Sequence, residues 1–428
     1  MRNRREKFCR QLAELYVASE WRYSVLAALS IESVTRLPAD IDELINDLLA
    51  RYSLRPHVEE LTQYLVSSPR LKRWFVGRSP YPRVSRYVIS PTANPELING
   101  ELPVLASVSD ISEWLCISRG ELEWLADLWR TDKEEAPHQN HYSYRTVQKS
   151  RGRIRVLEIP KTRIKAIQRE INKEIVELMP VHDAAMGFRK GLSCKDHARK
   201  HVGKNFISLF DISHCFQSIT WLQVKRLFAR LGYPDSVAAY LAGLCSHRVR
   251  KQQIAQTEIG KALNRRLLQR HLPQGAPTSP GLANAAMFHL DKRLAGLANK
   301  FEYAYSRYAD DIAFSSDNRW PREYLEPLVG AIVIDEGFEL NFRKTRFKQH
   351  HQKQKIVGIV CNERINVDRK EYDNLKAILT NCVRDGITTQ NRLNHPNFRA
   401  HLLGKIAYVK SLNQHKGEKL ARIFEKIA

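Results

Sequence analysis

The feature that most constrains the fold is a pair of adjacent aspartates, Asp310 and Asp311, inside a strongly apolar stretch. Tyrosines precede the pair at three nearby positions, and Ile312-Ala313-Phe314 follows it at once. An isolated Asp-Asp pair is most often a solvated turn, but two like charges between apolar strands are costly unless a cation compensates them. The context therefore predicts a strand–turn–strand unit over residues 301–315, with its turn at 308–311 and a metal-binding role for the pair.

A third aspartate, Asp211, ends the short apolar strand predicted at residues 206–210. A tight turn can bring one aspartate of a pair beside the end of a neighbouring strand. We therefore expect Asp211 and Asp310 to share two divalent cations, with Asp311 nearby. Mg²⁺ is usually held by one or two carboxylates together with substrate phosphates, and two such ions would activate a 3′-hydroxyl and stabilise a leaving pyrophosphate.

The chain carries a large excess of positive charge: 69 lysines and arginines against 46 aspartates and glutamates, a net charge of +23 over 428 residues. Such an excess indicates a polyanionic partner, nucleic acid before an anionic membrane surface. Residues 341–428 hold 19 basic against 7 acidic residues, so about half of the net charge lies in about one fifth of the chain. This asymmetry favours a localised nucleic-acid track.

The seven cysteines are scattered and none forms a CxxC pair, which argues against a disulfide framework or a zinc finger. No run of about 18 apolar residues is present, and no apolar segment follows the basic N-terminus. These patterns predict a protein of the reduced cytoplasm that has no membrane partner.

Hydrophobic periodicity predicts the remaining elements. Residues 1–100 are predicted to be mainly helical, and residues 108–128 to form two short helices. The favoured interpretation is that these two helices pack on the next domain; the alternative is that they bind DNA as a helix-turn-helix. A basic hairpin is expected at residues 147–159, with its turn at 150–152. Helices are expected at residues 162–178, 223–231 and 236–244, and from an N-cap at Ser279, with Pro280 as the first helical residue, toward Leu297.

Three motifs resemble those of reverse transcriptases in order and spacing. They are Phe210-Asp211-Ile212-Ser213-His214-Cys215-Phe216, Leu272-Pro273-Gln274-Gly275-Ala276-Pro277-Thr278-Ser279-Pro280 and the catalytic box Tyr308-Ala309-Asp310-Asp311. From about residue 102 to the end, the chain is more closely similar to bacterial retron reverse transcriptases, especially those of the myxobacterial kind. Further matching blocks are residues 152–169, 185–191, 336–345 and 381–400.

The resemblance implies a catalytic centre for nucleotide addition. Asp211, Asp310 and Asp311 would be the carboxylates that hold two Mg²⁺ ions, with Mn²⁺ as an alternative. Ile212 would lend a backbone carbonyl to the second ion. Lys344 would lie near the leaving pyrophosphate as a proton donor.

The resemblance also implies a pocket for deoxynucleoside triphosphates. Lys149 and Arg155, on the basic hairpin, would pair with the triphosphate. Phe216 would lie under the incoming sugar and clash with a 2′-hydroxyl, which implies the use of dNTPs. Gln274 and Gly275 would line the pocket at the nascent base pair.

Two elements associated with retron reverse transcriptases appear in altered form, and we assign them to RNA recognition. The Asn-Ala-x-x-His element appears with His197 in place of the asparagine and with His201 as its final histidine. The Val-Thr-Gly element appears as Ile356, Val357 and Gly358.

The fold that the resemblance implies is a right-hand polymerase of the α+β class. Its expected parts are a helical N-terminal extension (residues 1–100), a helical pair with the fingers (101–205), a palm with interleaved fingers helices (206–340) and a basic thumb (341–428).

The implied function is RNA-templated DNA synthesis on a cognate structured non-coding RNA. An internal 2′-hydroxyl would prime the reaction and leave branched, RNA-linked DNA. Because no RNase H domain is recognisable, a host RNase H would remove the template. Retrons of this kind act in antiphage defence, and a separately encoded effector protein would be the partner.

Three alternatives stay open at this point. Another defence-associated or abortive-infection reverse transcriptase would synthesise DNA without a retron RNA. A group II intron maturase would normally carry a longer splicing segment or a His-rich nuclease end. A non-enzymatic RNA-binding protein with an inactive polymerase core would not need the three aspartates.

Overall fold

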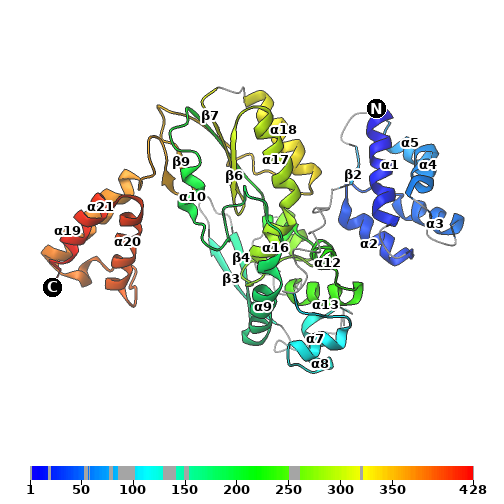
Figure 1. Ribbon diagram of the computed structural model, residues 1–428, viewed down its shortest axis with the longest axis horizontal. Helices are drawn as coiled ribbons and strands as arrows, with labels where there is room; N and C mark the ends of the chain where they lie inside the picture. The colour runs from blue at the N-terminus through cyan, green and yellow to red at the C-terminus, as the bar shows by residue number, and fades with distance from the viewer. Residues whose placement is uncertain are drawn as a thin grey trace. The chain divides into compact units, whose positions relative to one another are not determined.

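The protein is an α+β structure with a strongly helical N-terminal region and, further along the chain, a four-stranded β-sheet (Figure 1). The computed structural model describes residues 2–17, 21–52, 56, 58–76, 81–84, 102–128, 141–148, 154–249, 261–318 and 322–427. These residues form two compact units, each assembled from three segments of the chain. The first contains residues 1–180, 214–290 and 327–340, and the second contains residues 181–213, 291–326 and 341–428.

The predicted helical N-terminal region is present. Its elements are α1 (Arg2–Val17), α2 (Tyr23–Ser33), β1 (Val34–Thr35), α3 (Ile41–Arg51), α4 (Val58–Ser67), α5 (Pro69–Trp74) and β2 (Arg83–Val84). One hydrophobic cluster is built from buried side chains between Phe8 and Val84. In α3, Ile41, Leu44, Ile45 and Leu48 recur at helical spacing and are all buried, so the periodicity in the sequence marks the face that packs on this core.

The remaining elements of the first unit are mostly helices. They are α7 (Val108–Trp114), α8 (Arg119–Ala126), β3 (Tyr142–Gln148), β4 (Ile154–Pro160), α9 (Thr162–Glu174), the 3₁₀ helix η3 (Val176–Leu178), α11 (Cys215–Ser218), α12 (Trp221–Arg230), α13 (Asp235–Cys245), α15 (Lys261–Leu267) and α16 (Ser279–Ala286). Strands β3 and β4 pair antiparallel from Tyr142 with Pro160 to Gln148 with Ile154, which confirms the predicted hairpin strands. The predicted turn of this hairpin lies outside the described residues.

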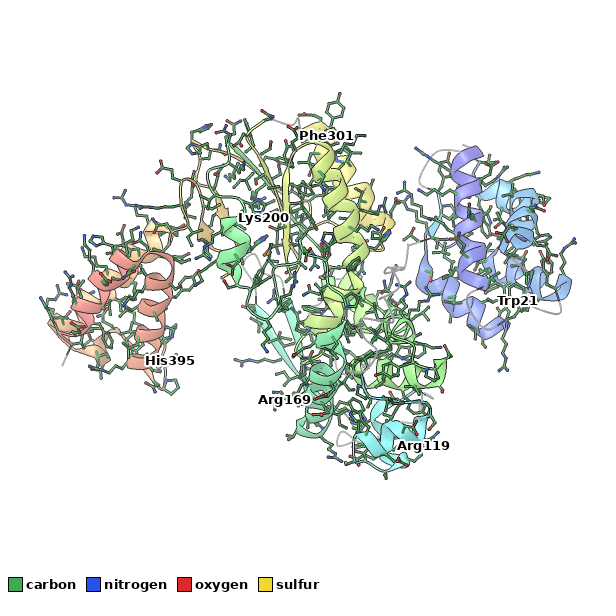
Figure 2. All side chains as sticks on the ribbon, in the orientation of Figure 1. Trp21, Arg119, Arg169, Lys200, Phe301 and His395 are labelled. Atoms are coloured by element: carbon green, nitrogen blue, oxygen red, sulfur yellow. The ribbon has the colours of Figure 1, made fainter. Side chains whose placement is uncertain are left out.

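The short helix pair α7–α8 packs on α13, as the favoured interpretation of residues 108–128 predicts. A Cβ atom on Gly243 of α13 would lie 2.8 Å from the carbonyl oxygen of Ala126, so the two helices approach closely. Arg270 donates to the Ala126 and Asp127 carbonyls at 2.5 and 2.7 Å, which satisfies the C-terminal end of α8. Arg119, labelled in Figure 2, begins α8 and lies over the ring of Tyr240.

The sheet of the second unit positions the three aspartates. It contains β6 (Ala304–Tyr308), β7 (Asp311–Ser316), β5 (Phe206–Asp211) and β8 (Arg346–Gln349), in that spatial order, and every neighbouring pair is antiparallel. Phe210 makes edge contacts with Phe314 and Phe347, at centroid distances of 6.1 and 5.9 Å. These aromatic contacts join β5 to β7 and β8, and the register of β5 and β7 places Asp211 opposite Asp311.

The elements not yet given lie between residues 194 and 424. They are α10 (Cys194–Arg199), α17 (Phe288–Lys300), α18 (Arg322–Asp335), β9 (Lys355–Ile356), β10 (Ile359–Val360), α19 (Arg369–Asp385), the 3₁₀ helix η4 (Ile387–Gln390), α20 (Phe398–Leu412) and α21 (Gln414–Phe424). Buried apolar residues of α19, α20 and α21 belong to one hydrophobic cluster with Ile356 and Ile359. Figure 2 labels His395, which precedes α20 and stacks on His401 at a centroid distance of 4.7 Å.

Two sequence predictions about helix boundaries are wrong. The helix expected from Ser279 to Leu297 is two helices, because α16 ends at Ala286 and α17 begins at Phe288. Ser279 is not the N-cap: Thr278 holds that position, and the Ser279 hydroxyl donates to the Pro273 carbonyl at 2.7 Å. The helix expected over residues 162–178 is α-helical only to Glu174 and continues as the 3₁₀ helix η3.

Among the helices that the structure describes, none combines the length and the apolar character needed to cross a bilayer.

Candidate active site

The three aspartates meet at one end of the β5–β7 strand pair. Asp211, the last residue of β5, pairs in register with Asp311, the first residue of β7. Asp310 lies in the two-residue turn between β6 and β7, and its carbonyl oxygen accepts a hydrogen bond from the Ile212 N–H at 2.9 Å. Directly opposite residues of an antiparallel pair point to the same face. Asp211 therefore has Asp311 as its cross-strand partner, and Asp310, which the sequence analysis expects to share the cations with Asp211, lies in the adjoining turn.

The electrostatics of this corner are unfavourable for unneutralised carboxylates. Burial raises the pKa of Asp311 to about 7, and the neighbouring Asp310 and Asp211 carboxylates act in the same direction. The Lys344 ammonium acts against these effects but does not cancel them. A carboxylate that is destabilised by burial and by two like charges is stabilised by a bound cation.

Asp211 is held by two residues of the segment that precedes β8. Lys344 donates from Nζ to the Asp211 carboxylate, and Asn341 donates from Nδ2 to its Oδ1 at 3.2 Å. The Asn341 N–H also donates to the Asp211 carbonyl at 2.7 Å. The structure thus brings the predicted Lys344 to the predicted Asp211, and it adds Asn341, which the sequence analysis missed.

The donor set fits a hard divalent cation, because carboxylate and carbonyl oxygens are the ligands that such ions prefer. Asp211, Asp310 and Asp311 supply the carboxylates, and the Ile212 carbonyl belongs to the same strand end. With the side chains in their present positions, no group of three aspartate, glutamate, histidine or cysteine side chains among the described residues could hold a metal ion. The raised pKa of Asp311 is the feature of this site that a cation would relieve.

The turn that carries Asp310 is tightly enclosed. Ala309 has a positive φ of 55°, which an L-residue rarely adopts, and it needs support from its surroundings. A Cβ atom on Gly187 would lie 2.8 Å from the Ala309 nitrogen and 3.3 Å from Cγ of Tyr308. Gly187 is therefore required by close packing against the catalytic box.

Four residues of the predicted nucleotide pocket belong to the first unit: Arg155, Phe216, Gln274 and Gly275. Arg155 lies on β4. Three residues further along this strand, Glu158 contacts the loop that contains Gln274 and Gly275. The Glu158 N–H donates to the Gln274 carbonyl at 3.0 Å, and a Cβ atom on Gly275 would lie 2.7 Å from the Glu158 carbonyl oxygen. Phe216 is half-buried in α11, and Lys149 lies outside the described residues.

A buried ion pair between His271 and Glu158 connects the start of this loop to β4. His271 and Glu158 are fully buried, and Nε2 of the histidine lies 3.1 Å from each Glu158 carboxylate oxygen. Although burial disfavours the charged ring, the Glu158 carboxylate raises the pKa of His271 above its ordinary value. The sequence analysis missed this pair, because its partners are 113 residues apart and carry no shared motif.

The two histidines assigned to RNA recognition, His197 and His201, are buried close to the catalytic box. His201 hydrogen bonds through its two ring nitrogens to the hydroxyls of Ser315 and Ser306, at 2.6 and 2.7 Å. Ser306 is also hydrogen bonded to Nδ1 of His197, at 2.8 Å, and the His197 ring lies 5.9 Å from that of Tyr308. Both histidines have no exposed surface, so their side chains contact protein groups and an effect on RNA would be indirect.

The second RNA-recognition element is a tight hairpin turn. Ile356 and Ile359 pair across β9 and β10 and are buried, whereas Gly358 at the tip is exposed. Val357 and Gly358 both have positive φ, 44° and 86°, which is the conformation of a type I′ turn. This conformation is unusual for a β-branched residue such as Val357.

Comparison with known proteins supports the same interpretation. Residues 147–361 match the family described as reverse transcriptase (RNA-dependent DNA polymerase). The chain is 37% identical over 323 residues to the retron Mx65 reverse transcriptase of Myxococcus xanthus, covering 75% of this chain and 72% of that protein. It is 35% identical over 271 residues to the retron Mx162 reverse transcriptase of the same organism, covering 61% of this chain and 54% of that protein.

A more distant relative is the retron Ec86 reverse transcriptase of Escherichia coli, which is 28% identical over 284 residues, or 66% of this chain and 79% of that protein. Among solved structures, a foamy viral protease–reverse transcriptase in complex with an RNA/DNA hybrid is 16% identical, with a TM-score of 0.33 over 67% of this chain and 33% of that one. The family match covers half of the chain, and the Mx65 relative is matched over more than two thirds of its length. The chain therefore belongs to the retron reverse transcriptases and is an RNA-directed DNA polymerase.

Proposed function

We propose that this polymerase copies part of its own structured non-coding RNA into DNA, beginning from an internal 2′-hydroxyl and leaving branched, RNA-linked DNA. The observation that carries the proposal is the corner formed by Asp211, Asp310 and Asp311, in a chain whose similarity to retron reverse transcriptases extends over three quarters of its length. We further propose a role in antiphage defence with a separately encoded effector, and template removal by a host RNase H.

Reverse transcriptases depend on divalent metal ions, and we propose two Mg²⁺ ions, with Mn²⁺ as a substitute. Asp211, Asp310, Asp311 and the Ile212 carbonyl would hold them. When bound, such ions lower the pKa of the attacking hydroxyl and neutralise the leaving pyrophosphate. Lys344 would give a proton to the pyrophosphate, and its hydrogen bond to Asp211 supports this proposal.

Residues of β4 and of two other segments of the first unit would bind the nucleotide. We propose that Arg155 and Lys149 pair with the triphosphate, that Gln274 and Gly275 contact the nascent base pair, and that Phe216 excludes a 2′-hydroxyl. The close contact between Gly275 and Glu158 supports a loop whose position is fixed before nucleotide binds. Such preorganisation reduces the entropic cost of aligning the reactants.

RNA recognition would involve two different regions. We propose that the turn between β9 and β10 contacts RNA directly, since Gly358 at its tip is exposed, while Val357 is half-buried against the hydrophobic cluster. His197 and His201, which are buried, would act by holding the hairpin that carries the catalytic box. The basic residues of 341–428 would supply sequence-independent contacts with phosphates.

The test is to express the protein with its native flanking sequence, purify it, and sequence all nucleic acid that remains bound. We expect one structured RNA joined to a discrete DNA through a 2′–5′ linkage, which a debranching enzyme would release. The same preparation from an Asp310→Ala/Asp311→Ala variant should contain the RNA without DNA. Recovery of DNA with no RNA branch from an active enzyme would overturn the retron proposal in favour of another defence-associated reverse transcriptase.

A further inference from the structure

Arg307 is a charged side chain with no exposed surface, located in β6 immediately before the catalytic box. Its partner is Asp291 of α17, which is also fully buried. The guanidinium donates from Nε to Oδ1 at 2.8 Å and from Nη2 to Oδ2 at 2.6 Å. Tyr305 donates its hydroxyl to the same Oδ1 at 2.6 Å, so the carboxylate is well satisfied.

The third nitrogen of the guanidinium has a different partner. Nη1 of Arg307 donates to the carbonyl oxygen of Ala309 at 2.9 Å. Ala309 is the residue with positive φ in the turn, and Asp310 follows it directly. The side chain therefore connects a fixed anchor on α17 to the strained peptide that precedes the first catalytic aspartate.

The backbone of Arg307 does not need this side chain to stay in place. Its N–H donates to the Ala184 carbonyl at 2.8 Å, and its carbonyl accepts from the Met186 N–H at 2.7 Å. Residue 307 also pairs with Ile312 across β6 and β7. The strand is thus held by main-chain bonds, and the guanidinium adds a contact from the side chain to the turn.

We propose that Arg307 is a positioning residue of the active site: anchored by Asp291, it holds the Ala309 carbonyl and thereby fixes the turn that carries Asp310 and Asp311. The inference rests on the proposed roles of these two aspartates. A lysine could pair with Asp291 but could not also donate two parallel bonds to it and a third to Ala309, because only the planar guanidinium has that set of donors.

The experiment separates positioning from stability with a neutral double variant, Asp291→Leu/Arg307→Met. Removing one partner of a buried ion pair strands the other charge, but replacing both by apolar residues is often tolerated. We expect the double variant to fold and to bind RNA like the wild type, while kcat falls on the order of 100-fold. KM for dNTP should change little, and the Mn²⁺ concentration for half-saturation should rise.

Two further measurements complete the test. Mn²⁺ binding to the protein–RNA complex, followed by paramagnetic broadening without any turnover, should weaken in the double variant. Arg307→Lys keeps a buried charge beside Asp291 and should lower kcat while the thermal unfolding midpoint stays close to that of the wild type. As a matched control, Lys204→Met/Asp317→Leu removes an exposed ion pair of 2.7 Å in the same unit and should change none of these quantities.

Full activity and unchanged Mn²⁺ binding in the folded double variant would overturn the proposal. Failure of both the double variant and Arg307→Lys to fold would also overturn it, because the pair would then serve only the stability of this unit. A wild-type enzyme that incorporates no nucleotide would instead refute the proposed function, which is a distinguishable outcome.

Discussion

At the scale of single residues, Gly187 shows how little space surrounds the catalytic box. Its hydrogen faces the Ala309 nitrogen and the Tyr308 ring, where a methyl group would be 2.8 and 3.3 Å away. Because neither neighbour is the far end of a flexible side chain, a substitution must move the turn itself. The position of Asp310 therefore depends on a residue more than 100 positions earlier in the chain.

Gly187→Ala should lower the rate of nucleotide incorporation on the order of 100-fold, because a shift of about 1 Å at reacting groups has effects of this size. Primer extension on an RNA template measures the rate. The matched control is Gly296→Ala in α17, where no atom lies within 4 Å of the added methyl. That variant should keep its activity and gain up to about 1 kcal/mol in stability from helix propensity. Equal activity in both variants would contradict the close-packing argument.

His197 should make the stability of the second unit depend on pH. Burial, together with the charges of Arg307 and Lys200, lowers the pKa of His197 to about 4, and the His201 ring also lies against it. The unfolded chain binds the proton more readily, with a pKa near 6.5, so the free energy of unfolding should fall as the pH drops from about 6.5 to about 4. The loss should be on the order of 3 kcal/mol at the acidic end.

The measurement is a series of thermal unfolding curves between pH 7 and pH 4 for the wild type and His197→Gln. The variant should show a flatter dependence on pH. His415→Gln, at an exposed position of α21, serves as the control and should follow the wild-type curve. A variant that loses as much stability as the wild type would show that His197 takes up no proton on unfolding.

At the scale of elements, the loop after His271 is placed by β4. The Gly275 backbone has φ of 144° and lies against the Glu158 carbonyl, and the buried His271–Glu158 pair fixes both sides of the contact. A change in this loop should therefore alter nucleotide binding before it alters the chemical step.

Gly275→Ala should raise KM for dNTP about tenfold or more, because the added methyl would lie 2.7 Å from the Glu158 carbonyl and displace Gln274. Steady-state kinetics on an RNA template gives KM and kcat separately. Gly232→Ala is the matched control, since Gly232 also has positive φ, 96°, but open space around it. Backbone strain without a clash should cost stability and leave KM unchanged; a rise of KM in both variants would refute the clash.

The elements that could be predicted from the sequence are those with a local signal. The apolar strand before Asp211, the hairpin around the catalytic box and the strands of the basic hairpin follow from alternation and turn residues within a few positions. Helix ends were predicted less well. Ser279 has the side chain of a typical N-cap, but its hydroxyl donates a hydrogen bond to the Pro273 carbonyl instead. Competition from a tertiary partner is not visible in local sequence.

The site shows the same division. The three aspartates could be predicted from the sequence because charged residues in an apolar stretch are unusual. Lys344 could be predicted because it lies in a motif of the family. Asn341, Glu158, His271 and the Arg307–Asp291 pair could not, because each acts through a partner that the fold supplies. His197 and His201 were found as a motif, but only the structure shows that they are buried among strand serines.

At the scale of the whole molecule, the net charge of +23 should govern RNA affinity. Residues 341–428 carry about half of it, and α20 and α21 expose Lys405, Lys410 and Lys419. Each phosphate contact releases a condensed counterion, so the logarithm of the association constant falls linearly with the logarithm of salt concentration.

Replacing Lys405, Lys410 and Lys419 by glutamine should weaken RNA binding and reduce the salt slope by about 2, if all three lysines contact phosphates. Fluorescence anisotropy with a structured RNA, at several salt concentrations, measures the slope. The control replaces Lys7, Lys72 and Lys300, which are exposed elsewhere and change the net charge equally. Identical salt slopes for the two triple variants would show that the lysines of residues 341–428 contact RNA phosphates no more than lysines elsewhere in the chain do.

The most direct test of the central claim is nucleotide incorporation by the wild type and by Asp310→Ala/Asp311→Ala on the same RNA template, with RNA affinity measured in parallel. The wild type should extend the primer only with a divalent cation present. The double variant should incorporate no dNTP while it binds RNA as tightly as the wild type, and Asp317→Ala, at a surface ion pair, should remain active. Undiminished incorporation by the double variant would contradict the assignment of this corner as the active site.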